Sequence, residues 1–215
     1  MEKQLLNAPQ AEVDSTYLYG IFRHLKRPKD KIAYLLKKGD LILVRRGLYV
    51  VSPDYNKVAS TKVLASMMYS PSYLSLQSAL KYYGLIPEAI HGEVCVTRLR
   101  TKRFNTPFGE FEYHHSGLYD FLWGLRFAQI DDSRQVRVAS PIKALYDLIR
   151  YSVSNYKQKN YETLAEYLDL MRLDLDDFHC TASEYEALKA ARRSSLSQFL
   201  IQWLSNNEVM CSHER

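Results

Sequence analysis

The chain of 215 residues has little of the chemistry that marks disulfide-rich, metal-binding or membrane proteins. Its three cysteines, Cys95, Cys180 and Cys211, are odd in number and lack the paired Cys/His spacing of a zinc site. No apolar run approaches the ~18 uncharged residues of a membrane-spanning helix, and the N-terminus lacks a secretory signal pattern. We therefore expect no disulfide, no metal and a reducing cytoplasmic location.

Motifs of catalysis and cofactor binding are also missing. The sequence contains no glycine-rich phosphate loop. Ser75 and Ser140 lie outside a Gly-x-Ser-x-Gly elbow, so we expect both to cap helices. Glu110, Glu112 and His114 alternate onto one face of an expected strand and are the best candidates for acid–base chemistry, but an exposed polar face is the favoured interpretation. We therefore expect no catalytic residue, no cofactor and no enzymatic activity.

The positive charge is concentrated at one end of the chain. The whole sequence has 29 Lys and Arg residues against 24 Asp and Glu residues, a net charge of +5. Residues 1–51 contain ten of the basic and five of the acidic residues, so this quarter accounts for the entire net charge. Such asymmetry is typical of a polyanion-binding module attached to a neutral body. The hydrophobic content of 47% is that of an ordinary globular protein.

The first 51 residues are expected to form short helices and a basic hairpin. Helices are predicted over residues 2–8, 16–22 and 28–38, followed by a hairpin over residues 41–51. Asp14 and Ser15 can cap the second helix, and Pro28 and Gly39 are typical of the start and end of the third. This order predicts a winged helix-turn-helix, in which the third helix enters the major groove of DNA and the hairpin is the wing.

The third helix is expected to have one apolar and one basic face. The apolar stripe, spaced at i, i+3 and i+4, consists of Ile32, Leu35 and Leu36. Lys31, Tyr34 and Lys38 form a second face, polar and positive, that we expect to point toward DNA bases. An ordinary solvated helix exterior is the alternative interpretation.

Arg45-Arg46-Gly47 forms the expected tip of the hairpin. Its two guanidinium groups would neutralise phosphates and release counterions, although a solvated basic turn is the alternative. The complete set of candidate DNA-binding residues is Arg27, Lys29, Lys31, Tyr34, Lys37, Lys38, Arg45 and Arg46.

The rest of the chain is expected to complete an α+β fold. We predict a winged-helix domain over residues 1–56, a mixed α/β body over residues 57–155, and helices over residues 156–215 that pack on the body. In the body, strands are expected over residues 73–74, 93–99, 125–130 and 134–140, with two more within residues 103–115 around Pro107-Phe108-Gly109, and helices over residues 57–69, 76–83 and 142–152. The tail is expected to be helical over residues 160–204.

Three segments, in this order, resemble AbiEi-type antitoxins of bacterial abortive-infection (type IV) toxin–antitoxin pairs. The segment over residues 39–49, with Gly39-Asp40-Leu41 and Arg46-Gly47-Leu48-Tyr49, is similar to the wing of that family. The stretches "YLSLQSALKYYGL" (73–85) and "VRVASPIKALYDLI" (136–149) are similar to segments of its body. Ile142 stands where the family usually has Glu, so any role of that acid is absent. The resemblance does not extend past about residue 155.

The resemblance implies a DNA-binding regulator of its own operon that acts as an antitoxin in phage defence. Its implied partners are double-stranded promoter DNA, with inverted repeats, and a cognate nucleotidyltransferase-like toxin encoded beside it; no membrane is involved. Two alternatives from other classes stay open: a DNA-processing enzyme targeted by the winged helix, and an adaptor whose body docks another protein.

Overall fold

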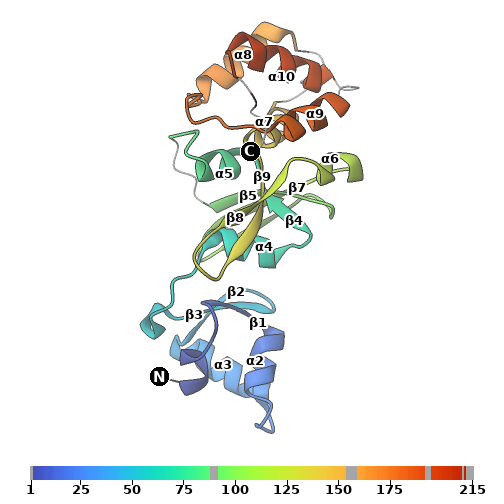
Figure 1. Ribbon diagram of the computed structural model, residues 1–215. Helices are drawn as coiled ribbons and strands as arrows, with labels where there is room; N and C mark the ends of the chain where they lie inside the picture. The colour runs from blue at the N-terminus through green and yellow to red at the C-terminus, as the bar shows by residue number, and fades with distance from the viewer. Residues whose placement is uncertain (1, 88–91, 154–158, 192–194, 210, 212–215) are drawn as a thin grey trace.

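The computed structural model (Figure 1) describes residues 2–87, 92–153, 159–191, 195–209 and 211. A small helical module with a three-stranded sheet lies at the N-terminal end, a six-stranded mixed sheet with helices follows, and further helices lie at the opposite end of the molecule. The expected α+β class is confirmed at this level. None of the described helices has the length and apolar character needed to cross a membrane.

The N-terminal module follows the element order expected of residues 1–51, with one additional strand. Its elements are α1 (Lys3–Leu6), β1 (Glu12–Asp14), α2 (Ser15–Ile21), α3 (Pro28–Lys38), β2 (Leu41–Arg45) and β3 (Leu48–Val51). Asp14 caps α2 as predicted by accepting a hydrogen bond from the Tyr17 amide at 2.7 Å. Gly39 ends α3 in the left-handed conformation, with φ of 84°. The strand β1 was not expected, because three residues carry too short an alternation to signal a strand.

The three-stranded sheet, in the order β1-β3-β2, is covered on both faces. Leu41 and Val51 belong to the module's own core, together with residues of α2 and α3. Val44, Leu48 and Val50 belong instead to the large hydrophobic core of the body. The hairpin is therefore held between the module's helices and the body, as Figure 1 shows for β2 and β3 below α4.

The body is built on a mixed sheet in the order β6-β7-β5-β4-β9-β8, in which β4 and β9, and also β5 and β7, are parallel. Its strands are β4 (Ser72–Leu74), β5 (Gly92–Thr97), β6 (Lys102–Thr106), β7 (Gly109–His115), β8 (Leu125–Gln129) and β9 (Gln135–Ala139). Its helices are α4 (Thr61–Met68), α5 (Leu76–Tyr82), α6 (Leu118–Leu122) and α7 (Pro141–Ser152); the 3-10 turn η1 (Pro53–Tyr55), which precedes them, belongs to the N-terminal module, whose core contains Tyr55. The expected strands and helices are present; the short α6 was not predicted.

The C-terminal helices are α8 (Tyr161–Leu170), α9 (Ala182–Ala190) and α10 (Ser195–Asn206). Both α9 and α10 pack against α7, and Leu188, Leu200 and Trp203 are buried in the same core as the sheet. The tail is thus helical, as its periodicity predicts, and is continuous with the body through a shared core.

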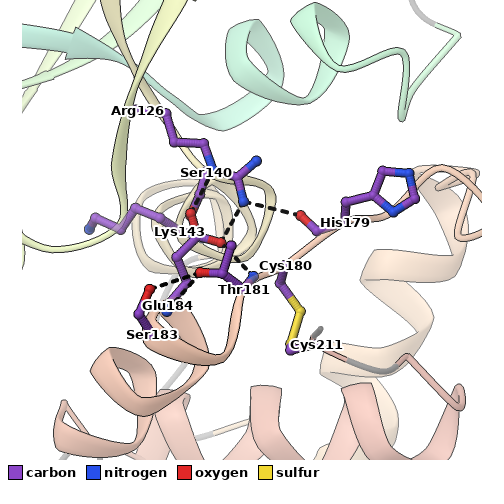
Figure 2. Close-up of a disulfide and its surroundings, with 9 residues drawn as sticks. All are labelled: Arg126, Ser140, Lys143, His179, Cys180, Thr181, Ser183, Glu184 and Cys211. Carbon is purple, nitrogen blue, oxygen red and sulfur yellow. Dashed lines mark hydrogen bonds and ion pairs between the residues drawn. A yellow bond between two sulfur atoms is a disulfide. The ribbon is translucent and has the colours of Figure 1, made fainter. Parts of the chain in front are cut away.

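The prediction that the chain forms no disulfide is wrong. Cys180 and Cys211 are bonded, with their Cα atoms 4.7 Å apart (Figure 2). Cys180 lies just before α9, and Cys211 lies a few residues after the end of α10 at Asn206, so the bond joins the two ends of this helical pair. Sequence spacing could not reveal this, because a separation of 31 residues has no characteristic signature. Cys95 is the free cysteine and is buried.

Candidate nucleic-acid interface

The exposed face of α3 is centred on Lys29, Ala33 and Lys37. On the inner side Ile32 and Leu35 are buried, as predicted. The stripe's third member, Leu36, is only partly buried. Tyr34 lies beside the exposed row and is 56% exposed, although a large aromatic side chain usually gains by burial. The helix therefore presents to solvent an aromatic ring and two lysines, Lys29 and Lys37, while the lysine over the ring is Lys31, with its Nζ atom 5.5 Å from the ring centroid.

Lys31 and Lys38 lie at the edges of this face and are paired with carboxylates of the module. The Lys31 Nζ atom is 2.5 Å from a Glu2 carboxylate oxygen, and both side chains are mostly buried. The Lys38 Nζ atom is 2.8 Å from the Asp40 carboxylate. Burial by itself would raise the pKa of Asp40, but hydrogen bonds from Lys38 and Tyr55 outweigh it and lower that pKa. The positive charges of these two lysines are therefore partly neutralised by carboxylates of the module, which the sequence pattern does not show.

The remaining basic residues predicted to bind DNA at α3 differ in whether a carboxylate lies close enough to neutralise them. Arg27 contacts Asp30 at 2.8 Å, and both side chains are more than half exposed, so water and salt screen this pair strongly. Lys29 and Lys37 have no acidic partner among the described residues. Of the basic residues predicted on α3, these two offer the least compensated charge.

The hairpin tip is fixed from two sides. The Gly47 carbonyl, in a turn that requires φ of 89°, accepts a hydrogen bond from the Ser15 amide at 2.9 Å. The guanidinium group of Arg45 lies over the ring of Phe104 in β6, 5.5 Å from its centroid. Arg46 is exposed. Both arginines are exposed, but they differ in their contacts: Arg45 lies against Phe104 of the body, whereas no contact between Arg46 and the body is found among the described residues.

The two body segments that resemble the antitoxin family meet in one buried polar network. The Lys143 Nζ atom in α7 is 2.6 Å from Asp147 Oδ1. The hydroxyl groups of Tyr73 and Ser75 donate to Asp147 Oδ2 at 3.0 and 2.7 Å. None of the four residues is more than 1% exposed. The Tyr, Leu and Ala residues of these segments are mainly core, as predicted.

The prediction that Ser75 caps a helix is wrong. Its side chain makes no capping bond to α5 and turns instead to Asp147, because β4 lies beside β9 and so brings the start of α5 next to α7. Ser140 does cap α7, accepting from the Lys143 amide at 3.4 Å. The i, i+4 spacing of Lys143 and Asp147 was the one sequence signal that could have revealed the ion pair. Burial lowers the pKa of Lys143, although Asp147 opposes this.

The polar face of β7 is engaged in ion pairs. Glu112 lies 2.9 Å from Arg103 and 3.2 Å from the Nε2 atom of His114, which stacks on Tyr151. Burial lowers the pKa of His114 despite the nearby Glu112 carboxylate. The face is thus only partly exposed. In the part of the chain that the structure describes, no cluster of three or more His, Cys, Asp or Glu side chains could hold a metal ion.

No protein-family model matches this chain, and no curated protein matches it. The relation to AbiEi-type antitoxins therefore rests on the three sequence segments alone and stays a prediction.

Proposed function

We propose that this protein is a DNA-binding transcriptional regulator that acts as the antitoxin of a type IV abortive-infection pair. The observation that carries the DNA-binding part is the exposed face of α3, where Tyr34 is open to solvent and Lys29 and Lys37 have no acidic partner among the described residues. The element order supports it, because helices followed by an antiparallel hairpin are the arrangement of a winged helix-turn-helix.

In this proposal α3 enters the major groove and the hairpin tip lies along the backbone. Tyr34 is the residue placed to reach base edges, where a good contact discriminates between bases by about 1–3 kcal/mol. Lys29, Lys37 and Arg46 contact phosphates, each displacing about one condensed counterion. Lys31 and Lys38 mainly stabilise the module through Glu2 and Asp40.

The antitoxin part of the proposal rests on the family resemblance. The body, with its helical tail, would then oppose a nucleotidyltransferase-like toxin, by direct contact or by an indirect route. The buried polar network around Asp147 is closed to solvent, so a substrate could not reach it. We assign it the role of holding together the two segments that resemble the family.

Binding of the full-length protein to duplex DNA from upstream of its own gene tests the proposal. We expect log affinity to fall linearly with log salt concentration, and the Lys29→Ala/Lys37→Ala variant to reduce the magnitude of that slope by about two units. Lys81→Ala/Lys159→Ala removes the same charge from exposed positions in the body and tail and serves as the matched control. Equal slopes for both variants would contradict the assignment to α3.

A cellular assay separates the two activities. The Lys29→Ala/Lys37→Ala variant should lose repression of a reporter driven by the upstream DNA yet still protect cells from the toxin encoded next to it. Incubation with supercoiled DNA and a divalent metal tests the enzymatic alternative. Cleavage of that DNA would replace the proposed function with DNA processing.

A further inference from the structure

A basic segment of the body lies directly beside the hairpin tip. Residues 98–103, which run from the end of β5 into β6, contain four basic side chains and no acidic one. Lys102, the first residue of β6, has its Nζ atom 4.8 Å from the centroid of the Phe104 ring. Arg45 of the hairpin lies over the same ring at 5.5 Å. Two positive charges from segments far apart in the sequence thus share one aromatic surface.

The four basic residues of this segment divide by their partners. Arg98 donates to the Ser116 carbonyl. Arg103 points to the opposite face of β6, where it pairs with Glu110 and Glu112. Arg100 and Lys102 are exposed and have no carboxylate partner among the described residues. Only these last two residues of the segment combine exposure with uncompensated charge.

The aromatic surface under these charges is itself well fixed. Phe104 packs edge-on against Tyr69 and Tyr113, with centroids 5.7 Å away in both cases. Tyr113 is buried, and its hydroxyl donates to the Ala65 carbonyl at 2.7 Å. Cation–π attraction to such a platform holds the charged groups in place. The ring does not neutralise these groups, so both keep their full positive charge.

The separation of the Arg45 and Lys102 charges is bounded by their distances to one ring. It cannot exceed the sum of 5.5 and 4.8 Å, which is close to the Debye length of about 10 Å at 0.1 M salt. At 0.1 M salt the repulsion between the two groups is therefore only partly screened, and an anion that reaches both groups relieves it. A row of phosphates running past the hairpin tip is such an anion.

From this juxtaposition we propose that Arg100 and Lys102 of the body extend the DNA-binding surface beyond the hairpin and contact phosphates of the same duplex. This inference rests on the proposed function. It also assigns part of the DNA binding to the body, which the charge distribution along the sequence does not predict. Residues 52–215 have zero net charge as a whole but contain this locally basic edge. The body then contributes to affinity without reading sequence, as phosphate contacts position a protein but do not specify bases.

The test compares full-length Arg100→Gln/Lys102→Gln with wild type on the upstream duplex over a series of salt concentrations. Glutamine retains much of the aliphatic stem and removes the charge, so the fold should persist, as circular dichroism will verify. We expect the slope of log affinity against log salt to fall in magnitude by about two units, with unchanged preference among sequences. Lys102→Arg, which keeps the charge, should restore about one of those units when combined with Arg100→Gln. Lys81→Ala/Lys159→Ala should bind like wild type.

Hydroxyl-radical footprinting supplies a second readout. The glutamine variant should lose protection at phosphates next to those covered by the hairpin tip, while the contacts of α3 remain. A wild-type slope and an intact footprint in this variant, together with loss of affinity in Lys29→Ala/Lys37→Ala, would overturn this inference alone. Absence of DNA binding by the wild-type protein would overturn it together with the proposed function.

Discussion

Arg134 and Glu12 form an ion pair across 122 residues of sequence, in which the single Arg134 Nη1 atom donates to both carboxylate oxygens, at 2.9 and 2.8 Å. Arg134 lies in the turn between β8 and β9, and Glu12 begins β1 of the N-terminal module. The Glu12 side chain is fully buried and also accepts a hydrogen bond from the Ser60 amide at 2.5 Å. The body therefore fixes the sheet that carries the hairpin through a pair that water cannot replace.

Removal of Arg134 should destabilise the protein strongly. Arg134→Met leaves the Glu12 carboxylate buried without its partner, a change that costs about 3–5 kcal/mol at comparable sites. Urea unfolding measures this loss. The double variant Arg134→Met/Glu12→Gln should recover part of it, because the buried charge is gone. Arg137→Ala, at an exposed position of β9, should change stability by no more than about 0.5 kcal/mol. Equal stabilities of Arg134→Met and Arg137→Ala would contradict this account.

Asp131 should make stability depend on pH in the acid range. A hydrogen bond from Arg134, followed by one from the Ser133 amide, lowers the pKa of Asp131 from 3.8 to about 2. Because this pKa is lower in the folded state, the contribution is complete above pH 3.8 and is lost as the pH falls toward 2. Asp131→Asn should flatten the dependence of unfolding free energy on pH in this window. A dependence of unfolding free energy on pH in Asp131→Asn that is the same as in wild type would contradict this account.

In the buried network of the body, removal of one charge should reduce the free energy of unfolding more than removal of both. Asp147→Ala removes the partner of a fully buried Lys143 and the acceptor of the Tyr73 and Ser75 hydroxyls, so we expect a loss of about 3–5 kcal/mol. Lys143→Met/Asp147→Leu removes both charges and should cost less than the single change. Chemical denaturation of the three proteins measures both values. A double variant less stable than Asp147→Ala would show that the ion pair itself stabilises the fold.

Local patterns predicted the local structure well. The cap at Asp14, the bounds of α3 between Pro28 and Gly39, and the hairpin around Gly47 follow from side-chain and backbone preferences over a few residues. The pairing of Glu12 with Arg134 could not be predicted in this way, because it depends on how the body folds back onto the module. The sequence also could not predict which of the DNA-binding lysines are neutralised by carboxylates. Their spacing on a helix is visible in the sequence, whereas the carboxylates that neutralise Lys31 and Lys38 become visible only in three dimensions.

The Cys180–Cys211 bond should be detectable by counting thiols. Cys95 is buried, and burial raises the pKa of its thiol well above the usual value, so the folded protein should react slowly with a thiol reagent. Unfolded without a reductant, the chain should show one reactive thiol, and with a reductant three. Three thiols in the unreduced, unfolded protein would show that the bond is absent in solution.

The same bond should stabilise the C-terminal helices. It joins the segment before α9 to the segment after α10. Next to Cys180, the side chains of Thr181 and Glu184 cap α9 reciprocally (Figure 2). Glu184 also forms an ion pair with Arg126. Closing a loop of 31 residues removes conformational entropy from the unfolded chain worth about 3–4 kcal/mol. Cys211→Ser should therefore unfold at lower urea concentration than oxidised wild type, and addition of a reductant should lower the wild-type midpoint to that of the variant without changing the variant itself.

Cys95→Ala is the control for loss of a thiol, since its effect should be the same with and without reductant. A wild-type midpoint that does not move on reduction would show that the helices are held by packing against α7 alone.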